Sequence, residues 1–383
     1  MAREQIPITP ALVTWARVRA GYTPENAANR FAKIAEWEAG DSAPTYPQLE
    51  AMADTFKVPI AVFFFPEPPD VPSIDESFRT LPEFELDQLP PKIRLLLRKA
   101  KTFQIALSEL NNGRNPADRL ITRDLVFPAT ISPSAMTDAV RNYLGVTVEN
   151  QAQWADTDVA LKGWRRCLLE VGIYVFKDQF RNDDFAGFCL TDENFPIIYV
   201  NNTNSPARQI FTIFHELAHL LFKTSGIDIE SDGYIDELSG DAKRIEVLCN
   251  QFAGIFLVPP TDFTAALRAT SGEITQQIVA RLAEQFKVSQ LVIYRRLLDT
   301  NRIDQTAYDA AQSRAMAKGR SRPRGSGDYY NTKLAYLGRP FVALALSQYH
   351  QERISAEQLA DYLDIKPQNL VTLEERFLRG ART

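Results

Sequence analysis

The strongest constraint on the fold is an apolar stretch at residues 211–222 that contains two of the chain's three histidines. Its large hydrophobic residues recur at helical spacing, which predicts a helix packed into a core. His215 and His219 are four residues apart, so their imidazoles lie on one face of that helix, one turn apart. Neutral imidazole is a common ligand of Zn²⁺, and this spacing therefore predicts a zinc site.

Glu216 directly follows the first histidine, where its carboxylate can reach a water on the metal rather than the metal itself. Zinc lowers the pKa of such a water toward ~7, and Glu216 can accept the proton and carry it to a leaving amine. Two incidental histidines on a core helix are the alternative interpretation. The apolar residues around the motif favour the catalytic metal site.

A catalytic zinc ion usually has three protein ligands and one open position. The remaining histidine, His350, is far away in the sequence, so a carboxylate is expected as the third ligand. Glu246 is favoured because it lies on the next apolar helix, and Cys249 one turn later is a thiolate alternative, although buried free cysteines are common. Tyr234 is a candidate oxyanion stabiliser by position alone. The other acids fall in a polar, glycine-containing loop: Asp228, Glu230, Asp232, Asp236, Glu237 and Asp241.

Three short β-rich runs precede the motif and predict a small sheet: residues 173–176, 187–190 and 196–200. Helical patterns surround them. The fold class expected is therefore α+β and mostly helical, with the small sheet beside the motif helix. The helices are expected near residues 159–171, 241–257, 273–286 and 288–299.

The length of 383 residues predicts more than one domain. A helical segment, 1–65, ends at a proline cluster, and a helical connector, 66–150, follows. The metal-binding domain is expected over 151–300. The last segment, 301–383, begins with a flexible basic linker and ends in a small helical unit. The linker contains Arg314, Lys318, Arg320, Arg322 and Arg324.

Composition excludes several classes of protein. The net charge is −5, which argues against an electropositive nucleic-acid binder and leaves DNA contact to a local patch. No apolar run is long enough to cross a bilayer, and the N-terminus lacks the pattern of a signal peptide. Three scattered cysteines do not form a disulfide framework. These features predict a cytoplasmic protein without membrane contact.

Two sequence blocks together resemble the signature of the ImmA/IrrE family of metallo-endopeptidases. The blocks are FTIFHELAHLL at residues 211–221 and EVLCNQFA at residues 246–253, with FLVP following at 256–259. The resemblance implies a zincin-like peptidase domain in which Glu246 matches the family's glutamate ligand. Members typically cleave transcriptional repressors in phage, mobile-element or stress-response circuits, so a protein substrate of that kind is implied.

The N-terminal segment resembles the Xre-type helix-turn-helix that is often fused to such peptidases. Thr23 is an expected N-cap, with Pro24 at the first helical position. The stretch from Ala27 to Trp37 is several residues shorter than the usual motif, and the shortening falls where the recognition helix should begin. Residues 1–65 contain six Lys/Arg and seven Asp/Glu, so they carry no basic footprint. Both DNA binding and a docking or dimerisation role remain open.

The C-terminal unit contains a second helix-turn-helix pattern, opened by a capping box from Ser355 to Gln358. A packing role is the more common explanation for such a pattern. For the whole chain, the leading hypothesis is a zinc-dependent endopeptidase that cleaves a regulatory protein. The alternatives are a DNA-binding regulator whose peptidase-like domain acts as a sensor, and an antitoxin-like binding module. The presence of Glu216 favours the enzyme, because a structural zinc site needs no general base.

Overall fold

The computed structural model describes residues 5–70, 89–224, 226–229, 238, 240–270, 273–319 and 328–380. The chain divides into two compact units, Met1–Lys99 and Ala100–Thr383. Their boundary falls within the helix α7 (Pro91–Leu110). Among the described residues, none of the helices combines the length and apolar content needed to cross a membrane.

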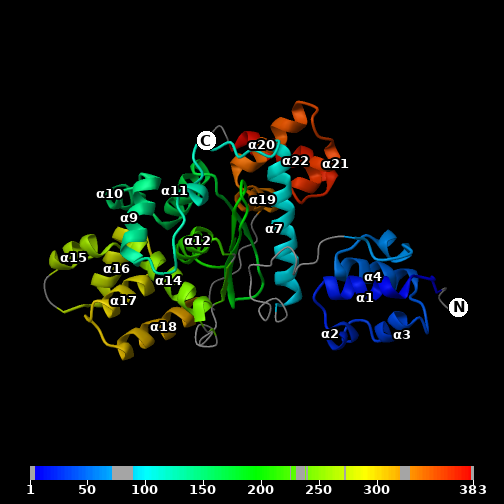
Figure 1. The fold of residues 1–383 in the computed structure, drawn as a ribbon, viewed down its shortest axis with the longest axis horizontal. Coiled ribbons are helices and arrows are strands. Elements are labelled where there is room, and N and C mark those ends of the chain that lie inside the picture. The colour runs from blue at the N-terminus through cyan, green and yellow to red at the C-terminus, as the bar shows by residue number, and fades with distance from the viewer. Residues whose placement is uncertain are drawn as a thin grey trace. The chain divides into compact units, whose positions relative to one another are not determined.

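The first unit is a small helical bundle with one continuous apolar core. Its core is built around Trp37, Phe56 and Phe63, which are almost completely buried. As predicted, Thr23 caps a helix by accepting a hydrogen bond from the backbone N–H of Asn26. The elements are α1 (Pro10–Arg19), α2 (Pro24–Ala28), α3 (Ile34–Ala39), α4 (Tyr46–Phe56) and the 3₁₀ helix η1 (Ile60–Phe64) (Figure 1).

The second unit contains a four-stranded mixed sheet in the order β1-β3-β2-β4. β1 and β3 are parallel, whereas β2 pairs antiparallel with both β3 and β4. The three predicted strands are confirmed, with ends shifted by one or two residues, and the fourth was not predicted. The strands are β1 (Tyr174–Asp178), β2 (Phe185–Leu190), β3 (Ile197–Asn201) and β4 (Ile227–Ile229).

Alternating side chains divide the sheet residues between two helical layers, which lie on opposite sides of the sheet in Figure 1. One face carries Phe176, Phe188 and Tyr199, whose rings stack and continue onto Phe103 of α7 and Phe341 of α20 (Arg339–His350). The other face joins the core formed by three helices. These are α11 (Thr157–Glu170), α12 (Pro206–Leu221) and α14 (Gly240–Leu257).

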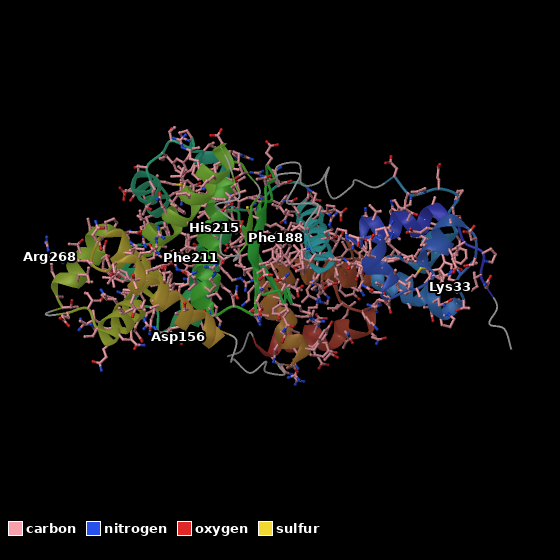
Figure 2. The ribbon with its side chains drawn as sticks, turned by 90° about the horizontal axis from the view of Figure 1, so that it is seen from below. Lys33, Asp156, Phe188, Phe211, His215 and Arg268 are labelled. Atoms are coloured by element: carbon pink, nitrogen blue, oxygen red, sulfur yellow. The ribbon has the colours of Figure 1, made fainter. Side chains whose placement is uncertain are left out.

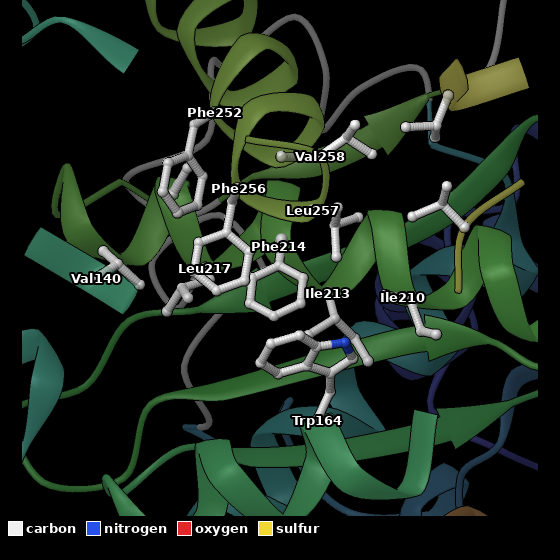
Figure 3. Packing of buried hydrophobic residues seen from close by; sticks show 14 of the residues in the cluster. Val140, Trp164, Ile210, Ile213, Phe214, Leu217, Phe252, Phe256, Leu257 and Val258 are labelled. Carbon is white, nitrogen blue, oxygen red and sulfur yellow. The ribbon is translucent and has the colours of Figure 1, made fainter. Parts of the chain in front are cut away.

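An aromatic cluster holds these three helices together behind the predicted metal motif (Figure 3). The ring of Phe214 on α12 stacks on Phe256 of α14 with centroids 4.1 Å apart, and meets Trp164 of α11 edge-on at 4.8 Å. All three residues are at most 1% exposed. Such aromatic pairs stabilise beyond their buried area. The apolar side of α12 is therefore fixed, and this fixes where its polar side chains lie.

Further helices surround this core. The predicted flexible linker is wrong at Arg314 and Lys318, which lie within α18 (Gln305–Gly319), because its alanine-rich sequence favours a helix. Arg320, Arg322 and Arg324 lie outside the described residues. The predicted capping box of Ser355 and Gln358 is confirmed at the start of α21 (Ala356–Tyr362). The other elements are α8 (Ile121–Asp124), α9 (Pro133–Leu144), α10 (Val148–Ala152), α15 (Pro260–Arg268), α16 (Gln276–Phe286), α17 (Gln290–Asp299), α19 (Tyr329–Leu337), η2 (Pro367–Asn369) and α22 (Leu370–Arg379).

Candidate metal centre

The helix α12 carries the two histidines into the interior of the second unit. It begins at Pro206, after Ser205 caps it by accepting a hydrogen bond from the backbone N–H of Arg208. Figure 2 shows His215 on this helix, with Phe211 one turn earlier. His215 is 1% exposed and His219 is 3% exposed. The Nε2 atoms of both rings have a partner on the neighbouring helix, whereas Nδ1 of His215 has none among the described residues.

Glu246 of α14 completes a group of three donors, as predicted. The Nε2 atoms of His215 and His219 lie 3.2 Å apart. The carboxylate oxygens of Glu246 lie 3.4 Å from Nε2 of His215 and 3.0 Å from Nε2 of His219. The three residues form a buried group that could hold a metal ion. The structure therefore brings the three predicted ligands together, and the binding of zinc by them stays a prediction.

The geometry of these donors fits a zinc ion. Ligands at about 2.0–2.1 Å from a tetrahedral ion lie about 3.3–3.4 Å from one another. The three distances between the donors, 3.0, 3.2 and 3.4 Å, are close to that spacing. Two imidazole nitrogens and one carboxylate oxygen are also a donor set typical of catalytic zinc. Three donors leave a fourth tetrahedral position for a substrate or water.

Glu216 is completely buried beside the donors, yet neither of its carboxylate oxygens has a hydrogen-bond partner among the described residues. Burial raises the pKa of Glu216 to about 7, although the neighbouring histidines oppose the shift. The Cys189 thiol is close enough to influence this pKa, but it makes no hydrogen bond of ordinary geometry to the carboxylate. A carboxylate that exchanges a proton near neutral pH suits general acid–base chemistry.

The charges around the donors favour a cation. Burial favours the neutral imidazole of His215, but the carboxylates of Asp228, Glu246 and Glu216 together raise its pKa to about 9. Burial would raise the pKa of Glu246, but His219 and His215 outweigh it and hold that pKa well below its ordinary value. Both pKa shifts show that a positive charge is favoured between His215 and Glu246, and a bound metal ion would supply it.

Three residues that the sequence did not single out position His219. Nδ1 of His219 lies 3.2 Å from the Thr224 hydroxyl, so the ring has a partner on the side away from the donors. Gly226 lies against the same ring, and a Cβ there would be 2.5 Å from Cδ2 of His219. The carbonyl oxygen of Gly226 accepts a hydrogen bond from the backbone N–H of Cys189 on β2, and the N–H of Gly226 donates one to the Cys189 sulfur. A glycine is required because any side chain would displace the imidazole.

The remaining predicted candidates lie outside this donor group or outside the described residues. Asp241 is exposed at the start of α14. Cys249 is buried, and burial raises the pKa of its thiol, which keeps it neutral. His350 pairs with Glu374 in the C-terminal unit. Glu230, Asp232, Tyr234, Asp236 and Glu237 lie outside the described residues.

Asp228 is a correction to the sequence interpretation. The sequence placed it in a solvated loop, but it lies on β4 and is only 7% exposed. It accepts hydrogen bonds from the Thr212 hydroxyl at 3.0 Å and from Arg208 at 3.3 and 3.5 Å. The tertiary contact with α12 stabilises a strand of only three residues, which is too short for its local pattern to predict.

A comparison with known families supports a metallopeptidase-type function for this domain. Residues 169–298 match the family model Peptidase_M78, described as the IrrE N-terminal-like domain. The matched region runs from the end of α11 into α17 and includes the sheet, α12 and α14. The match supports the ImmA/IrrE resemblance for this part of the chain. No curated protein matches the chain.

Proposed function

We propose that this chain is a zinc-dependent endopeptidase that cleaves a regulatory protein, such as a transcriptional repressor. The observation that carries the proposal is the buried triangle of His215, His219 and Glu246 beside the unpartnered carboxylate of Glu216. A site that only stabilised the fold would have no use for that carboxylate, because an unsatisfied buried group destabilises a protein. The match to a peptidase family supports the same reaction.

In this proposal each residue has a distinct role. His215, His219 and Glu246 hold Zn²⁺, which acts as a Lewis acid when it is bound. Glu216 accepts a proton from the attacking water and donates it to the leaving amine. In the metal-free protein, burial raises the pKa of Glu216 to about 7, so this carboxylate binds a proton more readily than an exposed glutamate does. The dry surroundings of Glu216 also strengthen its interaction with a developing charge.

The choice of a regulatory protein as substrate rests on the family resemblance and on the Xre-like pattern of the N-terminal segment. That segment would bring the peptidase to a regulatory complex, through either DNA or a protein. The described part of the first unit offers one buried arginine, Arg17, which is already bound to Glu38. Because residues 1–65 also carry more acidic than basic side chains, docking to a protein is the simpler role.

The decisive experiment compares cells that produce the wild-type chain with cells that produce Glu216→Gln. The substitution keeps the size of the side chain but removes the proton acceptor, so turnover should fall on the order of a hundredfold or more. Quantitative proteomics of new protein termini should then reveal fragments only with the wild type. Glu170→Gln is the control, because Glu170 is an exposed glutamate on α11 that is 67% accessible.

The purified proteins complete the test. Wild type, Glu216→Gln and Glu170→Gln should each contain about one zinc per chain, whereas His215→Ala together with His219→Ala should contain none. Undiminished zinc in the double variant would exclude this metal site. If all proteins behave as expected toward zinc but no cellular protein is cut, the regulator or antitoxin-like alternative replaces the enzyme.

A further inference from the structure

Strand β4 contacts the metal helix at two separate points. Immediately before the strand, Gly226 lies against the ring of the ligand His219. Two residues later, Asp228 accepts a hydrogen bond of 3.0 Å from the hydroxyl of Thr212, which is fully buried on α12. The two contacts lie on either side of His215 and Glu216 along α12. A shift of β4 would therefore move the support of His219.

The contact between Asp228 and Thr212 is held in a tight site on the sheet. Asp228 is paired in register with Gly187 of β2. A Cβ at Gly187 would lie 2.5 Å from the methyl group of Thr212 and 2.9 Å from the carbonyl oxygen of Tyr199. The absence of a side chain at Gly187 lets α12 approach the sheet closely enough for the Thr212 hydroxyl to reach Asp228.

Arg208 adds a third contact at the edge of the same site. Its guanidinium lies 3.3 Å from Asp228, and its side chain is 31% exposed. Arg208, Thr212 and Glu216 follow one another at intervals of four residues, so they lie along one side of α12. Asp228 is thus bound to the side of the helix that carries the general base.

Asp228 also brings a negative charge to the metal centre without being part of the donor group. It is 7% exposed, and its charge acts on both His215 and Glu216. In surroundings of low dielectric constant, a negative charge that acts on His215 favours a cation at that ring. The carboxylate is kept in this position by the donors of Thr212 and Arg208.

We propose that Asp228 is a positioning residue of the metal centre, which fastens β4 to α12, holds His219 in its ligating orientation and raises the affinity for the metal ion. This inference rests on the proposed function, because it assumes that the three donors bind zinc. Residues outside the ligand set that orient ligands typically change metal affinity by 10–100-fold when they are replaced.

The test uses the full-length chain and measures zinc affinity by competition with a chromophoric chelator. Asp228→Asn retains the shape but removes the charge, and zinc affinity should fall about 10–100-fold. Thr212→Val removes only the hydroxyl donor, so zinc affinity should fall less than in Asp228→Asn. Thr212→Ser keeps the hydroxyl and should have the zinc affinity of the wild type. The matched control is Asp178→Asn, which removes a carboxylate from β1 at the other edge of the sheet and should leave affinity unchanged.

The Co²⁺-substituted proteins give a second measurement that loss of stability alone would not change. The visible spectrum of protein-bound Co²⁺ depends on the geometry of its ligands. It should shift in Asp228→Asn and Thr212→Val, but not in Asp178→Asn or Thr212→Ser. If Asp228→Asn does not fold, Thr212→Val decides the question by the same two measurements.

The outcomes separate this inference from the proposed function. If the wild type binds zinc while Asp228→Asn and Thr212→Val match it in both affinity and Co²⁺ spectrum, Asp228 is no positioning residue, although the metal site stands. If the wild type itself binds no zinc, the proposed function fails, and this inference falls with it. A fall in affinity confined to Asp228→Asn and Thr212→Val, with Thr212→Ser at the wild-type value, supports the positioning role.

Discussion

Arg17 in the first unit and Glu216 in the second are both buried, but within the described part of the chain only Arg17 has hydrogen-bond partners. In the first unit, Arg17 is 7% exposed, and its guanidinium is bound to both oxygens of Glu38 and to the carbonyl of Tyr22. In the second unit, Glu216 is completely buried, and its carboxylate has no hydrogen-bond partner among the described residues. Burial of a charge is costly in both places. The partners of Arg17 offset that penalty, whereas Glu216 has no such partner among the described residues.

This difference distinguishes a structural charge from a functional one. A paired charge such as Arg17 fixes one arrangement of its helices, and its loss should affect stability alone. An unpaired carboxylate such as Glu216 destabilises the resting protein but is available for a proton or a substrate. The comparison predicts that substitutions in the first unit change stability without changing metal binding, whereas substitutions of the three donors or of the residues that contact them change metal binding.

The largest expected effect is on metal affinity. Glu246→Gln removes the charged oxygen donor, so zinc affinity should fall at least about a hundredfold. Asp241→Asn, on the exposed first turn of the same helix, should leave it unchanged. Isothermal titration with zinc measures both. Equal losses in the two variants would mean that general charge, rather than ligation by Glu246, controls binding.

The next effect tests the structural side of the comparison. Arg17→Leu leaves the largely buried Glu38 without its partner and should lower the free energy of unfolding of the first unit by about 2–4 kcal/mol. Lys33→Ala removes an exposed pair with Glu36 and should change it by less than about 1 kcal/mol. Hydrogen exchange of the backbone amides of α1, α3 and α4 measures both changes within the first unit. Reduced zinc content in folded Arg17→Leu would contradict the assignment of Arg17 to stability alone.

The local part of the site could be predicted from sequence, because the spacing of His215 and His219 and the apolar pattern around Glu246 are properties of single helices. Asp228 could not be predicted in the same way. Asp228 stands between Ile227 and Ile229 in a strand of only three residues, and an alternation this short does not identify a strand. Its burial depends on contact with Thr212, which lies sixteen residues earlier. A contact between two elements leaves little trace in either local pattern.

The fold shows the same limit. The runs that became β1, β2 and β3 were recognisable from their β-branched and aromatic residues. Their order was not, because the parallel pairing of β1 with β3 places β3 between β1 and β2, and this depends on how α12 and α7 pack on the two faces. The role of Gly226 was equally hidden, since only the folded chain brings it against His219.

A smaller effect concerns pH. In the metal-free protein, burial raises the pKa of Glu216 from its ordinary value of 4.5 to about 7. The folded state therefore holds this proton more tightly than the unfolded state, so the resulting stability is complete below pH 4.5 and is lost as pH rises through 7. The free energy of unfolding of metal-free Glu216→Gln, taken relative to that of the wild type, should therefore rise by roughly 2–3 kcal/mol from pH 5 to pH 8.

Urea denaturation of the two metal-free proteins at pH 5 and pH 8 measures this difference. Glu170→Gln should follow the wild type at both values, because Glu170 is exposed. A constant difference between Glu216→Gln and the wild type across this range would show that the Glu216 carboxylate finds a partner when it is ionised. The contrast with Arg17 would then disappear.

The smallest effects come from two glycines that serve different purposes, one beside the metal centre and one further along α14. Gly226→Ala places a Cβ 2.5 Å from the His219 ring, so zinc affinity should fall about tenfold, comparable with the loss of an orienting contact. Gly254→Ala places a Cβ on α14 where no atom lies within 4 Å, and it should raise the free energy of unfolding by about 0.4–1 kcal/mol through reduced backbone entropy. Zinc titration and thermal denaturation of both variants separate the two roles. Should Gly254→Ala also weaken zinc binding, the fit of α14 against α12 would itself be part of the metal centre, and the boundary between structural and functional residues would have to be drawn further from Glu216.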